Sequence, residues 1–267
     1  MLTIETMMSQ LSHRPFPLPG TPWVMFQQWS DLLFAHWAVE PGEVRAMVPA
    51  GLELDLFDGK AWLSVTPFRM TDLHLRGLPA IPGAGSFLEM NFRTYVRFTG
   101  KTGARSREHG APGTEPGDSL EKPGIFFFSL DASNLPAVVG ARIGFGLPYF
   151  WSDMTATPTG DGIDYISRRR QSPAAVEVRY APTGPLKPAK TELEVFLTER
   201  YCLYETRAGT VMRTEIHHIP WPLQPAKAEF RRNTLGEVHK IPMPLQPDLV
   251  QFSRQLDVVV FPPEIAG

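Results

Sequence analysis

The stretch SFLEMNFRTYVRF, residues 86–98, decides the fold class because its side chains separate into two faces when they alternate as in a β-strand. One face is apolar except for Thr94 and carries Leu88, Met90, Phe92, Val96 and Phe98. The other face carries Phe87, Glu89, Asn91, Arg93, Tyr95 and Arg97. The apolar face belongs against a core. The mixed face meets either bulk water, as in many sandwiches, or a polar cavity, and the pattern favours the two equally.

The composition is that of a globular protein with room for a large core. The chain has 267 residues, of which 43% are hydrophobic and 20% charged. Its net charge of −2 provides no basic surface for nucleic acid or an anionic membrane. The sequence shows no signal-peptide pattern or membrane-spanning apolar run, and its one cysteine, Cys202, suits a reducing compartment. We therefore expect a cytoplasmic protein without nucleic-acid or membrane partners.

Short alternating runs recur along the chain and predict a mainly β fold with few, short helices. Residues 51–68 read as a hairpin around Asp58-Gly59, because tight hairpin turns favour this dipeptide. Pro41 is placed to open a short helix. Further strands are predicted within residues 27–39, 125–133, 137–145, 161–170, 176–182, 192–205, 209–218 and 255–261. We expect one domain over residues 1–267, with its sheet curled into a barrel or half-barrel. The polar, glycine-rich residues 101–122 read as a mobile excursion between strands, with a lid as the alternative.

Several polar residues fall where apolar ones are expected. With residues 192–205 taken as a strand, Glu199 and Arg200 each lie within an apolar row, on opposite faces. A buried charge without a partner costs several kcal/mol, so each should be paired or line a wet cavity. In residues 125–133 the alternation places Phe127, Ser129 and Asp131 on one face, with Asp131 held by a turn at the end of the strand.

The adjacent histidines His217 and His218 do not predict a metal site, because neighbouring strand residues point to opposite faces. We expect a structural role, or one of them, His218, to line a pocket. Cys202 lies on a strand that reads as buried, which predicts an inert thiol. No cofactor-binding motif stands out, and we expect no metal and no cofactor.

Seven stretches taken together resemble one known family. They are LLFAHW (32–37), VPAGLELDLFDGKAWLSVTPF (48–68), EMNFRTYVR (89–97), KPGIFFFSLDA (122–132), ARIGFGLPY (141–149), LEVFLTERYCLYE (193–205) and HHIPWPL (217–223). The family is the YqjF-like, or DUF2071, family, which resembles acetoacetate decarboxylase in fold. The resemblance implies a single large, cone-like, antiparallel or mixed β-barrel around a central cavity. It therefore favours Glu89, Arg93 and Tyr95 as cavity-lining residues.

The resemblance in fold does not carry over the decarboxylase chemistry. That enzyme forms a Schiff base on a lysine activated by a neighbouring lysine, and this lysine pair matches Leu135 and Pro136 here. The active-site glutamate matches Glu89, whereas the active-site arginine falls near Ser30. The nearest lysine, Lys122, ends the polar stretch and is expected to be exposed. Schiff-base catalysis is therefore disfavoured.

Three hypotheses follow for the function. In the first, a lyase- or hydratase-like enzyme acts on a small carboxylate or carbonyl compound: Glu89 is the general acid or base, and Arg93 holds the anionic group. The remaining candidate ligand-binding residues are Tyr95, Glu199, Arg200, Tyr201 and His218. In the second, the barrel binds a small molecule without catalysis. In the third, the inner polar residues form only a buried structural network. A homo-oligomer is compatible with each.

Overall fold

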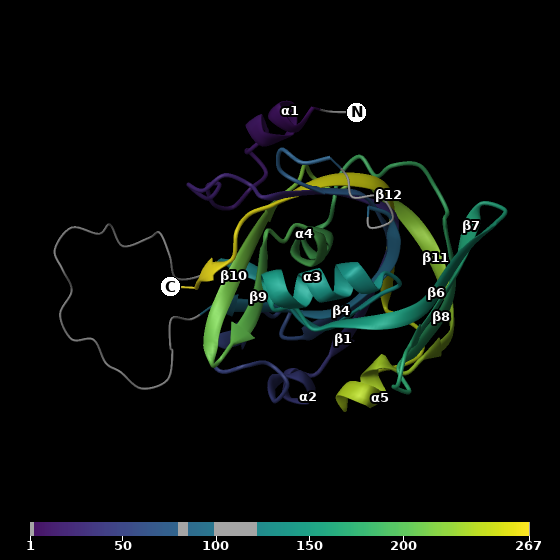
Figure 1. Ribbon diagram of the computed structural model, residues 1–267. Helices are drawn as coiled ribbons and strands as arrows, with labels where there is room; N and C mark the ends of the chain where they lie inside the picture. The colour runs from purple at the N-terminus through teal and green to yellow at the C-terminus, as the bar shows by residue number, and fades with distance from the viewer. Residues whose placement is uncertain (1–2, 80–84, 99–121, 267) are drawn as a thin grey trace.

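Strand β4 (Phe87–Phe98) contains the two-faced sequence and is buried over nearly its whole length, with only Arg97 exposed. The computed structural model that shows this describes residues 3–79, 85–98 and 122–266 (Figure 1). The excursion predicted at residues 101–122 lies outside the described residues except for Lys122. In the described part of the chain, no helix is long and apolar enough to cross a membrane.

The described residues form mainly strands. The strands are β1 (Met25–Val39), β2 (Leu52–Leu54), β3 (Ala61–Leu75), β4, β5 (Pro123–Ala132), β6 (Tyr149–Thr159), β7 (Gly162–Arg169), β8 (Ala175–Pro182), β9 (Cys202–Arg207), β10 (Thr210–His217), β11 (Leu223–Asn233), β12 (Leu249–Val260) and β13 (Glu264–Ile265). The helices are α1 (Ile4–Ser9), α2 (Pro41–Arg45), α3 (Leu135–Phe145), α4 (Glu192–Thr198) and α5 (Leu235–His239). The prediction of a mainly β fold with short helices is confirmed.

The sheet closes on itself, which confirms the predicted barrel. A ring of hydrogen-bonded strands runs β5–β6–β7–β8–β11–β12–β1–β3–β4 and returns to β5. A shorter ring also forms, because β5 pairs with β9 and β10 pairs with β12. Strand β5 runs parallel to β6 and β9 and antiparallel to β4, so the barrel is mixed. The two rings share the wall β12–β1–β3–β4–β5 (Figure 1).

The two faces of the shared wall belong to two different hydrophobic cores. Phe92 and the other apolar side chains on its face of β4 pack in a core with residues of β7, β8 and β11, such as Tyr165 and Phe230. Phe87 and Tyr95, on the opposite face, belong to a second core with residues of β5, β10 and β12. The predicted separation of residues 86–98 into two faces is therefore confirmed, and both faces are buried.

The strand predicted at residues 137–145 and the first half of the one predicted at residues 192–205 are helices, whereas residues 202–205 do form a strand, in β9. Residues 192–198 form α4, whose first turn is closed by reciprocal hydrogen bonds between Thr191 and Glu194, a capping box. Residues 135–145 form α3, which Asn134 caps by accepting a hydrogen bond from the Ala137 amide, and which ends at Gly146 with φ of 66°. The capping interactions at the ends of α3 and α4 favour helix locally. The apolar alternation that predicted strands in these segments does not exclude a helix.

A β-bulge changes the faces predicted for residues 125–133. Phe92 pairs with Ser129 but Arg93 pairs with Phe127, so Phe128 is the extra residue of the bulge. Beyond it the alternation is inverted, and Phe127 and Asp131 do not share a face. Asp131 is held by a buried ion pair with Arg169 at 2.8 Å rather than by a turn.

The Asp58-Gly59 turn is confirmed, with φ of 49° at Asp58 and 74° at Gly59 between the bridged residues Phe57 and Lys60. The predicted hairpin is not, because β2 pairs with β4 rather than with β3. The helix predicted to start at Pro41 is confirmed as α2.

Candidate functional site

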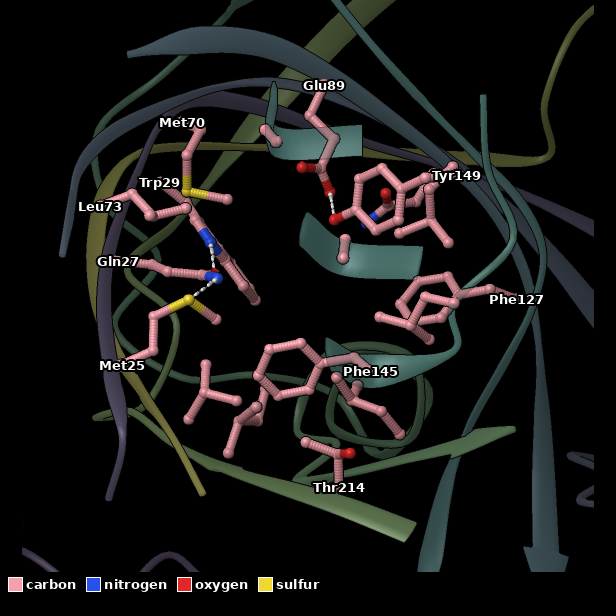
Figure 2. Close-up of a pocket in the computed structure, with 18 of the residues that line it drawn as sticks. Met25, Gln27, Trp29, Met70, Leu73, Glu89, Phe127, Phe145, Tyr149 and Thr214 are labelled. Atoms are coloured by element: carbon pink, nitrogen blue, oxygen red, sulfur yellow. Dashed lines mark hydrogen bonds between the residues drawn. The ribbon is translucent and has the colours of Figure 1, made fainter. Parts of the chain in front are cut away.

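The shorter ring surrounds a cavity of about 470 Å³. Its walls come from β1, β3, β4, β5, β9, β10 and β12, and α3 contributes one side of it. Figure 2 shows Met25, Trp29, Met70 and Leu73 on one side of the cavity, and Tyr149, Phe127 and Phe145 on the other. Most of the lining is apolar, so its few polar groups stand out.

The strand register orders the lining residues in rows along the cavity. Trp29 pairs with Met70, which pairs with Phe87. Two residues further along β4, Glu89 pairs with Ala132 of β5. Arg93 lies four residues beyond Glu89, roughly 13 Å along the strand, because a strand rises about 3.3 Å per residue. Glu89 and Arg93 therefore occupy different levels of one wall.

Glu89 is a protonated acid at neutral pH. Its Oε1 accepts a hydrogen bond from the Tyr149 hydroxyl at 3.0 Å (Figure 2), and its Oε2 has no partner in the part of the chain that the structure describes. Burial raises the pKa of Glu89 to about 8, although the Tyr149 hydrogen bond acts to lower it. Tyr165 donates to the Glu89 backbone carbonyl at 2.8 Å and so fixes the strand behind the side chain. A neutral carboxyl group can donate a proton to a bound molecule.

Arg93 is a buried cation that makes no ion pair among the described residues. Its guanidinium lies 5.6 Å from the centre of the Phe34 ring, and its Nε has no hydrogen-bond partner. Across the sheet, Arg93 pairs with Ser64, which pairs with His36. Burial and the charge of Arg93 lower the pKa of His36 to about 3, so this histidine is neutral and adds no second positive charge beside Arg93. Among the described residues, no anion neutralises the charge that Arg93 brings to the cavity.

Tyr95 lies beside the cavity rather than in its lining. Its hydroxyl donates to the Leu197 carbonyl at 2.9 Å and contacts the Ser64 hydroxyl at 2.6 Å. Ser64 in turn is 2.6 Å from His36 Nδ1. These bonds tie α4 to the wall of the barrel. The ligand-binding role predicted for Tyr95 stays a prediction, and its hydroxyl is already engaged.

Glu199 and Arg200, each predicted to be paired or to line a wet cavity, both have ion-pair partners. Arg200 lines the cavity but forms a buried ion pair with Asp55 at 2.6 Å. Burial lowers the pKa of Arg200, partly offset by Asp55. Glu199 lies outside the lining and binds Lys190, the Tyr201 hydroxyl and the Trp221 amide. Burial acts to raise the pKa of Glu199, but its cationic and hydroxyl neighbours lower it overall.

His218 lines the cavity, and Tyr201 lies behind it. The two rings stack with centroids 4.7 Å apart, and His218 Nδ1 contacts the Ile219 carbonyl at 2.7 Å. Burial lowers the pKa of His218 to about 4. Its neighbour His217 points elsewhere and contacts the Met7 carbonyl. Cys202 is buried on β9, and burial raises the pKa of its thiol to about 12.

Among the described lysines, none lines the cavity. The position matched to the decarboxylase lysine pair falls at the first turn of α3, where Pro136 lines the cavity and Leu135 is exposed. Lys122 is not exposed as predicted, because its ammonium group forms an ion pair with Glu215 at 2.6 Å. The geometry therefore provides no amine for a Schiff base in the described lining.

Sequence reasoning missed Tyr149, which orients Glu89. The two residues are 60 positions apart and meet because β6 adds to β5 in parallel. It also missed Gln27 and Trp29, which line the cavity and are joined by a hydrogen bond of 2.8 Å (Figure 2). No local signal marks these contacts, although Tyr149 ends one of the stretches matched to the family.

The closed mixed barrel with few short helices is a fold of the acetoacetate decarboxylase-like type. Acetoacetate decarboxylase from Legionella pneumophila superimposes with a TM-score of 0.60 at 13% identity, over 96% of this chain and 94% of that one. The enduracididine biosynthesis enzyme MppR complexed with pyruvate gives a TM-score of 0.59 at 12% identity, over 94% and 92%. These likenesses show the fold alone.

The chain belongs to the DUF2071 family of uncharacterized conserved proteins, whose sequence profile matches residues 26–110 and 117–257. It is 42% identical to the uncharacterized protein YqjF of Bacillus subtilis (strain 168) over 258 residues, which are 96% of this chain and 98% of that protein. The family resemblance of the sequence is thereby confirmed.

Proposed function

We propose that this protein binds a small carboxylate that also carries a carbonyl group, and that Glu89 exchanges a proton with it without Schiff-base chemistry. One observation carries the proposal. A neutral acid and a cation line the same largely apolar cavity, and among the described residues the acid has a free oxygen and the cation has no counter-ion. Leaving such groups unpaired inside a protein is costly, and a ligand that satisfies both would offset the cost.

The chemistry follows from the two groups. Arg93 offers charge-assisted hydrogen bonds to the carboxylate, and these are strong where water is excluded. Glu89, held by Tyr149, donates to the carbonyl oxygen and withdraws electrons from it. This polarisation makes the neighbouring carbon–hydrogen bond more acidic, so that a water molecule can take that proton while Glu89 gives its own to the carbonyl oxygen. The reverse transfers return both protons, and the polarised carbonyl carbon is also more open to attack by water. Both outcomes are steps of lyase- or hydratase-like enzymes.

Non-catalytic binding is the second candidate. It is favoured by the state of the other ionisable groups, because Arg200 is neutralised by Asp55 and burial keeps His36 and His218 uncharged. Glu89 would then have no second acid or base beside it. A purely structural network is the least favoured reading, since Glu89 and Arg93 are not bonded to each other and both line a cavity rather than a packed core.

The test combines binding with proton exchange. Isothermal titration with pyruvate, 2-oxobutanoate and 4-oxopentanoate should detect binding to the wild type that Arg93→Met abolishes. Arg179→Met, a substitution of an exposed arginine on β8, is the control and should bind normally. Proton NMR in D₂O then follows exchange of the hydrogens next to the carbonyl, which Glu89→Gln should slow at least tenfold. Binding without exchange would favour the second candidate, and no binding to the wild type would refute the proposal.

A further inference from the structure

We infer that the natural ligand is an elongated carboxylate whose apolar body extends from Glu89 to α3, and that Gly140 and Gly144 of α3 limit its length. This inference rests on the proposed function and adds the substrate class. It distinguishes the site from one shaped for a three- or four-carbon acid.

The order of groups along the cavity supports an elongated molecule. Arg93 lies at the level of Ser64 and Phe127, and Glu89 lies at the level of Ala132. Their side chains are also drawn apart, since Glu89 binds Tyr149 of β6 and the Arg93 guanidinium lies over Phe34 of β1. A molecule that reaches both groups spans several rows of the wall.

Beyond Glu89 the lining becomes apolar. Phe87 and Met70 form the next row of the sheet, and Met25 pairs with Leu75 further along. All four line the cavity, and the Leu75 side chain is 44% exposed, so the apolar surface continues to the mouth. The volume of about 470 Å³ lies within the range of sites that enclose drug-sized ligands. An apolar chain is the occupant that these walls favour.

Helix α3 presents four small residues to the cavity, beside the large Phe145, and turns three of its large apolar side chains to solvent. Ala137, Gly140, Ala141 and Gly144 line the cavity, whereas Leu135, Val139 and Ile143 are exposed on the other side. The four small residues follow the i, i+3, i+4, i+7 spacing of one helix face. A helix that packs against a core usually presents large apolar side chains at these positions.

The two glycines have a specific consequence. Glycine inside a helix is unfavourable relative to alanine, so a helix gains nothing from it unless the missing side chain is needed. A Cβ atom added at Gly140 or Gly144 would have no neighbour within 4 Å. Both glycines line the cavity and are also exposed, so they border open space at its solvent side. The unpartnered, buried atoms of Glu89 and Arg93 independently indicate that this space receives a ligand.

The test uses straight-chain monocarboxylates from butanoate to decanoate as probes, with dissociation constants measured by isothermal titration. Affinity for the wild type should rise about fourfold for each added methylene group, because burying one methylene group contributes about 0.8 kcal/mol to the free energy of binding. The rise should stop at the length that reaches α3. Equal affinity for all lengths would overturn the inference.

Gly140→Leu provides the second arm. It should weaken binding of the longest bound acid at least tenfold and leave the shortest unchanged, because only the long chain reaches α3. Gly42→Leu is the matched control, a glycine in α2 whose added Cβ also meets nothing within 4 Å. The double variant Gly140→Ala/Gly144→Ala repeats the test with alanine, the residue most favourable in a helix. Its thermal stability, measured in parallel, shows whether a change in binding comes from a loss of folding.

The outcomes separate the two proposals. If acids of every length bind and Gly140→Leu affects all or none of them alike, the proposed function stands and the inference on length fails. If neither these acids nor the oxo acids bind to the folded wild type, the proposed function itself fails.

Discussion

Glu89 and Arg93 share one face of β4 and do not form an ion pair with each other. Glu89 accepts a hydrogen bond from Tyr149, while the Arg93 guanidinium lies over the Phe34 ring. A structural network would join these two groups, because a buried charge pair repays its desolvation only when its members meet. Their separation along one wall of the cavity, with neither group neutralising the other, is what makes them a candidate site.

The pKa of Glu89 predicts a stability that falls with rising pH. The folded protein keeps this proton up to a pKa of about 8, whereas the unfolded chain releases it near 4.5. Between these values the unfolded state binds fewer protons, so the free energy of unfolding decreases by at most about 1.4 kcal/mol per pH unit. His36 and His218, whose pKa values are lowered on folding from 6.5, add the opposite slope up to about pH 6.5 in both proteins. Urea denaturation at pH 5 to 8 should therefore show a free energy of unfolding that falls more with rising pH in the wild type than in Glu89→Gln. Parallel slopes would contradict the assignment.

Tyr149→Phe should raise the pKa of Glu89 further, because it removes the hydrogen bond that acts to lower it. The lost bond should also reduce the free energy of unfolding by about 0.5–1.5 kcal/mol. Carbon-13 NMR of the labelled Glu89 carboxyl measures the pKa directly. Tyr165→Phe is the control: its hydroxyl bonds only to backbone carbonyls, and the titration of Glu89 should change less in that variant.

Arg93→Met should raise the thermal stability of the ligand-free protein or leave it unchanged. The substitution removes a buried charge that has no counter-ion in the described structure and keeps most of the apolar stem. Differential scanning calorimetry without added ligand measures the effect, with Arg179→Met alongside. A loss of several degrees relative to that control would mean that Arg93 stabilises the fold through contacts other than a ligand.

Asp131→Ala should destabilise the fold without affecting ligand binding. Asp131 and Arg169 are both buried, and removal of one member of such a pair costs about 3–5 kcal/mol. Asp153→Ala breaks the exposed pair with Arg170 and should cost at most about 1 kcal/mol. Chemical denaturation compares the two variants. Similar losses in the free energy of unfolding would show that burial does not determine how much these ion pairs stabilise the protein.

Local sequence patterns predicted several strands of the barrel wall but not how these strands pair with one another. The alternation in residues 86–98 predicted both faces of β4, and Asp58-Gly59 predicted its turn. Alternation misled at residues 192–198, where the Thr191–Glu194 capping box sets a helix. The bulge at Phe128 escaped detection because one inserted residue leaves no trace in composition, yet it inverts every face that follows.

By itself the sequence determined a β-rich chain, the two-faced strand that carries Glu89 and Arg93, and membership of a family with a barrel fold. These features depend on neighbouring residues and their period. Only the tertiary structure decided that Tyr149 reaches Glu89, that Asp55 neutralises Arg200, and that Arg93 has no partner in the described chain. The pairing of distant strands sets these contacts, and the free energy of a buried charge depends on what that pairing places beside it.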